Sequence, residues 1–182
     1  MKSLLLALGS LILVYISRAS LRAPRSQGFY RFFAWEAILA LLLLNADLWS
    51  RDPLAWYQLV AWTLLVASLV PLIFGVLTLR ARGKPAEQRE GDPSLLAFEK
   101  TTALVTTGIY HVIRHPLYGS LLLLAWGIFF KSPSWLGGAL LLIATSFLVL
   151  TAKADEAECT KVFGPAYQDY MKKTRMFIPY VF

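Results

Sequence analysis

Two polar clusters border apolar segments of this chain and contain side chains that could bind a charged ligand. The first, GIYHVIRHPLYGS (108–120), includes Arg114 and His115 and leads into the apolar run LLLLAWGIFF. The second, ADEAE (154–158), contains three carboxylates and follows another apolar run. Carboxylates attract an ammonium or a sulfonium group, and tyrosine rings can flank a cation or another ring. These residue types suit a cationic ligand with an aromatic part.

The two clusters should meet if the apolar segments between them form a helical hairpin. Residues 116–130 and 134–152 are apolar, and KSPS provides a turn between them. At a rise of about 1.5 Å per residue, His115 would lie level with about residue 149, and Glu156 would be about 10 Å further along the axis. We therefore expect two facing groups, Tyr110, Arg114, His115 and Tyr118 on one side and Asp155, Glu156 and Glu158 on the other.

The elements that must position these clusters are apolar enough to lie in a membrane. The chain is 57% hydrophobic, with a mean hydropathy of +0.56, whereas soluble domains are usually about 45–50% apolar. About 20 helical residues cross a bilayer, and unbroken apolar runs lack the alternation of a membrane barrel. We predict an all-α integral membrane protein with about five transmembrane helices, built on the runs 3–17, 32–49, 54–79, 116–130 and 134–152.

The basic residues predict the orientation of these helices. Fifteen of the 18 Lys and Arg residues fall in the first loop, the region from 80 to 114 and the tail, and three fall on the other side. Basic loops stay in the cytosol, so the N-terminus should be outside and the C-terminus inside. The net charge of +7 is explained by these short loops, so we do not expect nucleic acid as a partner. Residues 3–17 could also be a signal peptide cleaved after Ala19, but a retained helix is favoured.

The remaining segments complete a single domain over residues 1–182. Residues 1–100 would form helices 1–3 and a cytosolic loop with a short helix at about 94–100, and residues 101–182 would form the ligand-binding core. The segment TTALVTTGIYHVIRHP, before the fourth helix, is too short and polar to span and suits a re-entrant or interfacial position. The fifth helix should extend into the cytosol and end at Gly164-Pro165, before a cytosolic tail helix lying amphipathically on the membrane surface.

The two clusters together match a known motif. LVTTGIYHVIRHPLYGS, followed after the hairpin by DEAECTKVFGPAYQDY, resembles the isoprenylcysteine carboxyl methyltransferase and phospholipid methyltransferase families. Both are families of integral membrane enzymes that use S-adenosyl-L-methionine. The match covers residues 102–175, and its two halves occur in the expected order and separation. The resemblance implies a methyltransferase that uses S-adenosyl-L-methionine and a membrane-embedded or hydrophobic methyl acceptor.

The resemblance also implies roles for individual residues. Leu104 and Val105 would contact the cofactor largely through their backbone, and Glu156 would bind it as the second acid of the family's pair. Asp155 stands where the first glutamate is usual. The cofactor pocket would be lined by Tyr110, His115, Pro116, Leu117 and Tyr118. The candidate catalytic residues are Glu156, His115 and Arg114.

The methyl acceptor is left open by the sequence. Carboxyl methyltransferases have an arginine just before the acids, whereas this chain reads TAKADE there and has only Lys153 as a nearby cation. An isoprenylcysteine-like carboxylate, a phospholipid amine and a small hydrophobic thiol are all possible, and we favour a lipid-like acceptor. A non-catalytic membrane binding or assembly protein is an alternative. A transporter is less compatible, because the polar groups gather at one end rather than at mid-membrane. No obligate protein partner is evident.

Other candidate residues are interpreted more simply. His111 and His115 lie four apart and would suit a metal ion if their segment were helical, but no third ligand is in register and Pro116 disrupts the turn. We therefore expect no metal. Tyr167 and Tyr170 are expected to pack on the surface rather than to contact a ligand.

The predicted orientation can be tested with a tag placed after Phe182. We expect a protease to remove the tag only from the cytosolic side, because the basic residues hold the tail there. Cleavage in intact cells or right-side-out vesicles by an external protease would contradict the orientation.

Overall fold

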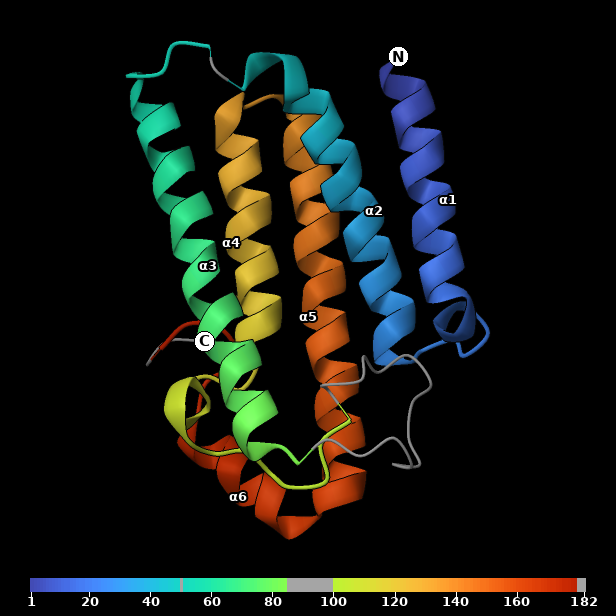
Figure 1. Ribbon diagram of the computed structural model, residues 1–182, viewed down its shortest axis with the longest axis vertical. Helices are drawn as coiled ribbons and strands as arrows, with labels where there is room; N and C mark the ends of the chain where they lie inside the picture. The colour runs from blue at the N-terminus through green and yellow to red at the C-terminus, as the bar shows by residue number, and fades with distance from the viewer. Residues whose placement is uncertain (50, 85–99, 180–182) are drawn as a thin grey trace.

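The computed structural model describes residues 1–49, 51–84 and 100–179 and shows a bundle of long helices (Figure 1). The predicted all-α class is confirmed. Successive long helices run in alternating directions, and a short helix lies across one end of the bundle. The long helices are α1 (Lys2–Leu21), α2 (Gln27–Asn45), α3 (Trp56–Arg82), α4 (Pro116–Lys131) and α5 (Trp135–Phe163), and the short one is α6 (Pro165–Lys173). Two single turns of 3₁₀ helix, η1 (Ala46–Leu48) and η2 (Gly108–His111), occur in the connections of the described ranges.

Local sequence explains where several of these helices begin and end. The side chain of Ser26 accepts a hydrogen bond from the Phe29 amide at the start of α2, and Ser134 does the same for α5, which satisfies one of the free amides of each first turn. Pro116 and Pro165 occupy the first positions of α4 and α6, where proline loses no helical hydrogen bond. Gly164 has φ +58°, a conformation that other residues rarely adopt, and it separates α5 from α6.

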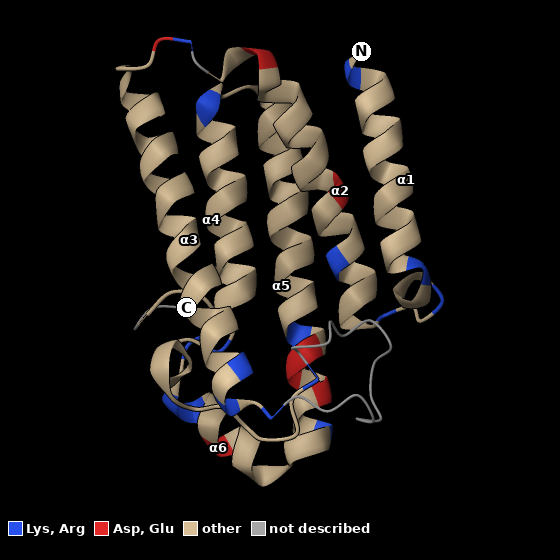
Figure 2. Cartoon of the chain, viewed as in Figure 1, with Lys and Arg blue, Asp and Glu red and all other residues tan. Residues whose placement is uncertain are grey.

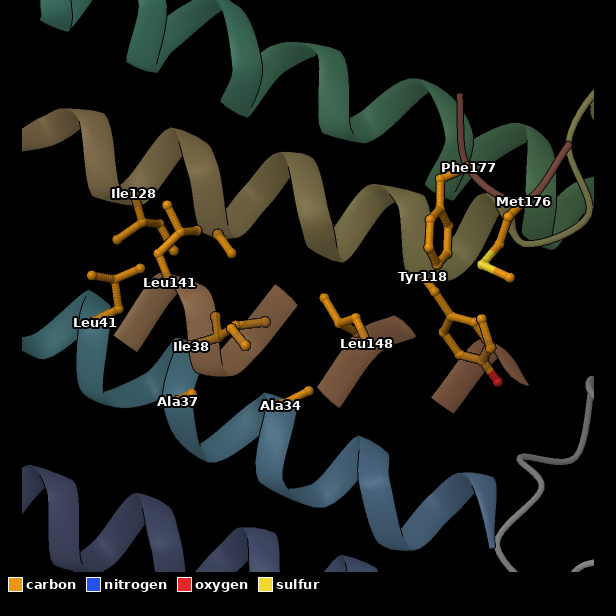
Figure 3. Close-up of a cluster of buried hydrophobic side chains, with 13 residues drawn as sticks. Ala34, Ala37, Ile38, Leu41, Tyr118, Ile128, Leu141, Leu148, Met176 and Phe177 are labelled. Atoms are coloured by element: carbon orange, nitrogen blue, oxygen red, sulfur yellow. The ribbon is translucent and has the colours of Figure 1, made fainter. Parts of the chain in front are cut away.

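The helices pack around a core formed mainly by α2, α4 and α5. Ala34, Leu41 and Leu148 are fully buried there, and Tyr118, Met176 and Phe177 close the same core near α6 (Figure 3). Helix α3 packs on α4, and α1 packs on α2. Gly75 allows α3 to approach the start of α4, since a Cβ at this position would lie 3.1 Å from Leu117 and 3.2 Å from Pro116. The polar segment before α4 is therefore held against the end of α3.

Four of the helical stretches are long and apolar enough to cross a membrane, namely Lys2–Leu21, Gln27–Leu48, Trp56–Arg82 and Trp135–Phe163. The chain is an integral membrane protein by this criterion. Helix α4 is also apolar but has 16 residues, a length of about 24 Å against a hydrocarbon core of about 30 Å. Five spans therefore remain a prediction. Most Lys and Arg residues lie at the end of the bundle that carries α6 (Figure 2), and the orientation of that end stays a prediction.

Helix α2 begins earlier than its apolar run suggested. It starts at Gln27 rather than near residue 32, because Gln27 and Arg31 are buried in the protein instead of facing lipid. The expected short helix at 94–100 falls almost entirely outside the described residues.

The sequence had indicated that the C-terminal tail lies along the membrane surface, but part of the tail packs against the helix bundle instead. Helix α6 ends at Lys173, and the chain then returns to pair with the segment before α4. The amide of Arg175 donates to the Val112 carbonyl at 3.1 Å, and the amide of His115 donates to the Met176 carbonyl at 3.1 Å. Phe177 is buried in the core. Burial of these apolar side chains fixes the tail against the bundle.

The end of the bundle opposite α6 is fixed by a buried lysine. The Lys131 side chain is 1% exposed, donates to Gln58 Oε1 at 2.9 Å, and lies 3.4 Å from the centre of the Trp62 ring. The amide nitrogen of Gln58 donates to the carbonyls of Arg51 and Lys131, each at 3.0 Å. This network links α4 to the start of α3. Lys131, one of the three basic residues that fall outside the predicted cytosolic segments, is thus part of the protein interior.

We predict that Lys131→Ala destabilises the protein by about 2–3 kcal/mol, because it leaves the Gln58 acceptor without a partner and empties the space beside Trp62. Lys153, which is exposed, offers the matched control, and Lys153→Ala should change stability by less than about 0.5 kcal/mol. Equilibrium unfolding in detergent measures both. Equal stabilities for the two variants would contradict a structural role for Lys131.

Candidate active site

A cavity opens at the α6 end of the bundle, between segments that are far apart in the sequence. The empty space within it, counted together with its open mouth, is about 700 Å³. The lining residues come from the starts of α2 and α4, the end of α3, the segment from 101 to 115, the end of α5, and α6. The cavity therefore forms only when all these elements are packed together.

A buried charge cluster lies beside this cavity. The Arg114 guanidinium donates from Nε to Glu156 Oε1 at 2.7 Å. The ring of His115, 4% exposed, lies between two carboxylates, with Nε2 3.3 Å from Glu156 and Nδ1 3.4 Å from Asp155. The two polar clusters of the sequence thus converge, as predicted.

Arg114 also binds the tail. Its Nη1 donates to the carbonyl of Thr174 at 2.5 Å and to that of Met171 at 3.2 Å. One guanidinium therefore joins the segment before α4, the end of α5 and the end of α6. Arg114 was a candidate catalytic residue, and in this arrangement its Nε and Nη1 donors bond to the protein itself.

The contact between His115 and the acids lies further along α5 than the hairpin estimate indicated. His115 was expected level with about residue 149, but its ring contacts residues 155 and 156. His115 precedes α4 with φ −123° and ψ 62°, and its amide is bonded to the tail. The estimate assumed a helical rise of about 1.5 Å per residue up to His115. Because the backbone at His115 is not helical, the estimate placed its side chain too close to the turn.

Tyrosines form the aromatic part of the site. The Tyr118 ring stacks on that of His115 at a centroid distance of 5.5 Å, and its hydroxyl donates to Gln27 Oε1 at 2.5 Å. The Tyr170 hydroxyl donates to the Tyr110 carbonyl at 2.6 Å. Burial raises the pKa of both Tyr167 and Tyr170, so their hydroxyls are neutral. The expectation that Tyr167 and Tyr170 pack on the surface was wrong: both are buried and line the cavity. Their spacing of three residues, which puts both on one face of α6, was the signal available.

Most predicted site residues line the cavity. They are Leu104, Val105, Tyr110, Arg114, His115, Pro116, Leu117 and Tyr118. Of the acid pair, Asp155 lines the cavity, whereas Glu156 lies behind it and is bonded to Arg114 and His115. The roles of these residues in binding or catalysis stay predictions.

Several lining residues were not found by motif reasoning. They are Gln27, Leu79, Thr101, Cys159 and Phe163. Leu79 and Phe163 lie near the ends of long helices and resemble other apolar residues, and Gln27 precedes the apolar run of its helix. None of them carries a pattern that distinguishes it in the sequence.

The charge state of His115 follows from its neighbours. Burial alone would lower the pKa of the imidazole, but the hydrogen bonds and negative charges of Asp155 and Glu156 outweigh it, and the pKa is raised above 6.5. The protonated ring is therefore favoured between the two carboxylates.

The two histidines do not converge as metal ligands would. His111 is exposed and lies with Lys172, Lys173 and Arg175 around a second, shallow cavity, because the segment forms a 3₁₀ turn and a bend instead of an α-helix. Among the residues that the structure describes, no group of three or more His, Cys, Asp or Glu side chains is arranged to hold a metal ion.

Comparison with known proteins agrees with the motif. The phospholipid methyltransferase family model matches residues 94–166, which include the segment before α4 and all of α4 and α5. The resemblance to membrane methyltransferases is confirmed. No solved structure matches the chain significantly.

Two curated relatives are similar to part of this chain. Methanethiol S-methyltransferase of Pseudomonas deceptionensis is 24% identical over 151 residues, covering 82% of this chain and 50% of its own length. Methanethiol S-methyltransferase 2 of Bradyrhizobium diazoefficiens is 32% identical over 76 residues, covering 41% of this chain and 28% of its own length. The chain thus spans at most half the length of these two relatives.

The raised pKa of His115 predicts a pH-dependent stability. The charged ring stabilises the folded state fully below about pH 6.5, and this contribution is lost as the pH rises through the higher pKa of the folded protein. We expect the unfolding temperature of the wild type to fall relative to that of His115→Gln between about pH 6 and about pH 9. Thermal unfolding in detergent measures this, and parallel pH profiles would show that His115 does not carry the charge.

Proposed function

We propose that this protein is an S-adenosyl-L-methionine-dependent methyltransferase for a membrane-embedded or hydrophobic acceptor. The observation that carries the proposal is the cavity at the end of the bundle, where the Asp155 carboxylate and several tyrosines meet residues matched by the methyltransferase motif. The names of the curated relatives support the same reaction class.

The lining side chains fit this methyl donor. Its sulfonium and ammonium groups are cationic, and Asp155 supplies a carboxylate at the cavity wall. The rings of Tyr110, Tyr118 and Tyr167 can flank a cation or the adenine ring, and the backbone of Leu104 and Val105 is available for the remaining polar atoms. The donor, when bound, supplies an activated methyl group on sulfur.

Arg114 and Glu156 of the charge cluster would then act chiefly by holding the cavity wall in place for the reacting molecules. Methyl transfer needs the acceptor atom about 3–3.5 Å from the methyl carbon and in line with the leaving sulfur. Arg114 and Glu156 fix the wall that carries His115 and Asp155, since their bond joins α5 to the segment before α4. A thiolate or carboxylate acceptor needs no base, whereas an ammonium must first lose a proton, for which Asp155 is the carboxylate at the cavity.

The described cations do not favour a carboxylate acceptor. Lys153, the nearest counterpart of the family's arginine, is exposed and does not line the cavity. Arg114 lines it but is bonded to Glu156 and to two tail carbonyls. An amine-bearing phospholipid or another acceptor with an apolar chain fits this site better than a prenylated carboxylate.

A small hydrophobic thiol is the second candidate acceptor. It is favoured by one specific observation: the curated relatives described above are named methanethiol S-methyltransferases. A thiol needs neither a cationic anchor nor a base once it is a thiolate, so the same cavity would serve it.

We further propose that the N-terminus faces outside and that the C-terminus and the site face the cytosol. The proposal rests on the Lys and Arg residues at the α6 end of the bundle (Figure 2) and on the preference of basic loops for the cytosol. This placement gives the polar donor access from the cytosol and the acceptor access from the bilayer.

Labelled S-adenosyl-L-methionine tests the function directly. We expect the purified protein to transfer label to phosphatidylethanolamine or a short-chain thiol more readily than to a prenylcysteine analogue. Asp155→Asn should weaken binding of S-adenosyl-L-homocysteine, which keeps the ammonium, by about tenfold, as expected for a lost charged hydrogen bond. Lys153→Ala is the matched exposed control and should bind normally.

Each outcome of this experiment separates the hypotheses. Binding without transfer to any acceptor would favour a non-catalytic binding protein. Transfer only to the prenylcysteine analogue would contradict the acceptor class argued from Lys153 and Arg114, and absence of both binding and transfer would overturn the proposed function.

A further inference from the structure

One buried polar group at the cavity has no hydrogen-bond partner among the residues that the structure describes. Gln27, the first residue of α2, is 1% exposed and lines the cavity. Its Nε2 forms no hydrogen bond, although it is buried. Buried amide groups are nearly always hydrogen-bonded, because leaving one unpaired sacrifices its bonds to water. An unpaired donor at a cavity wall therefore points to a bound molecule as its partner.

The other end of the same amide is firmly held. Gln27 Oε1 accepts a hydrogen bond from the Tyr118 hydroxyl at 2.5 Å, and the Tyr118 ring stacks on His115. This contact orients the amide so that its oxygen faces Tyr118 and its nitrogen faces away from it.

A second glutamine provides a comparison within the same chain. Gln58 is also 1% exposed, but its nitrogen donates to two carbonyls and its oxygen accepts from Lys131. The protein thus satisfies both polar atoms of the buried glutamine at the closed end of the bundle. At the open end it satisfies only one of them.

We propose that Gln27 determines ligand specificity by donating a hydrogen bond from Nε2 to an oxygen or nitrogen atom of the molecule bound in the cavity. The identity of that molecule rests on the proposed function. Nε2 can donate but cannot accept, so it favours accepting atoms and disfavours a cation at this position. The Asp155 carboxylate, at another part of the cavity wall, favours a cation or a hydrogen-bond donor. The ligand should therefore place a positive group toward Asp155 and an accepting group toward Gln27.

Two sources can supply such an accepting group. S-adenosyl-L-methionine carries a carboxylate, ribose hydroxyls and adenine nitrogens as well as its cationic groups. A phospholipid acceptor carries phosphate and ester oxygens. The two sources are separated by measuring donor-product binding and acceptor kinetics independently.

The test uses the full chain in detergent with S-adenosyl-L-homocysteine as the binding probe. Gln27→Met keeps the length of the side chain and removes the donor, and Gln27→Glu keeps an acceptor for Tyr118 while replacing the donor by oxygen. We expect Gln27→Met to weaken binding in calorimetry, or to raise the KM for the methyl acceptor, by about three- to tenfold, with a larger effect for Gln27→Glu.

Gln58→Met is the matched control. It removes a fully bonded buried amide far from the cavity, so we expect it to lower the unfolding temperature more than Gln27→Met does, with unchanged affinity for S-adenosyl-L-homocysteine. A purely structural role for Gln27 would produce the same pattern as Gln58, with lowered stability and normal binding.

The outcomes are distinct. Weaker binding of S-adenosyl-L-homocysteine assigns the contact to the methyl donor, and a raised acceptor KM with normal binding assigns it to the acceptor. Normal binding and normal acceptor KM in both Gln27 variants would overturn this inference while leaving the proposed function intact. A wild type that neither binds the probe nor transfers label would overturn the proposed function and this inference with it.

Discussion

The bond between Arg114 and Glu156 is the interaction on which the cavity end of the structure depends. Removing two charges from water is costly, and a buried pair is stable only when its remaining donors and acceptors are also bonded. Here the guanidinium also binds two carbonyls of the tail, and the carboxylate also contacts His115. These partners belong to segments far apart in the chain, so satisfying one pair of charges brings the tail, α5 and the segment before α4 together.

This constraint determines which groups lie at the cavity wall. Because Glu156 is used by Arg114 and His115, Asp155 is the member of the acid pair that lines the cavity. Tyr118 stacks on His115 and donates a hydrogen bond to Gln27 on α2. The position of His115 therefore also fixes the position of the Gln27 side chain. The wall therefore presents an acid, aromatic rings and an amide in a fixed order. A molecule with a cationic group to meet the acid and a hydrogen-bond acceptor to meet the amide would fit this wall.

Buried polar groups have different roles at the two ends of the bundle. At the end opposite α6, the buried Lys131 donates to Gln58 and lies over the Trp62 ring, and Asn45 donates to the Ile128 carbonyl at 2.8 Å. These groups bond to each other and to backbone, which fixes the helices without forming a site. The core between α2, α4 and α5 is apolar, and many outward side chains of the bundle, such as Val66, Leu69 and Phe74, are exposed in the isolated chain, as expected for residues that face lipid.

The sequence alone determined the helical class, the apolar segments and the two polar clusters, because each of these depends on local composition and spacing. It also determined most of the cavity wall through the motif around Tyr110, His115 and Tyr118. Tertiary structure decided what depends on contacts between distant segments: the return of the tail onto residues 112–115, the burial of Tyr167 and Tyr170, the separation of Asp155 from Glu156, and the position of Gln27. No local pattern specifies these contacts, since each requires that a side chain find its hydrogen-bond partner or its packing neighbours on another helix.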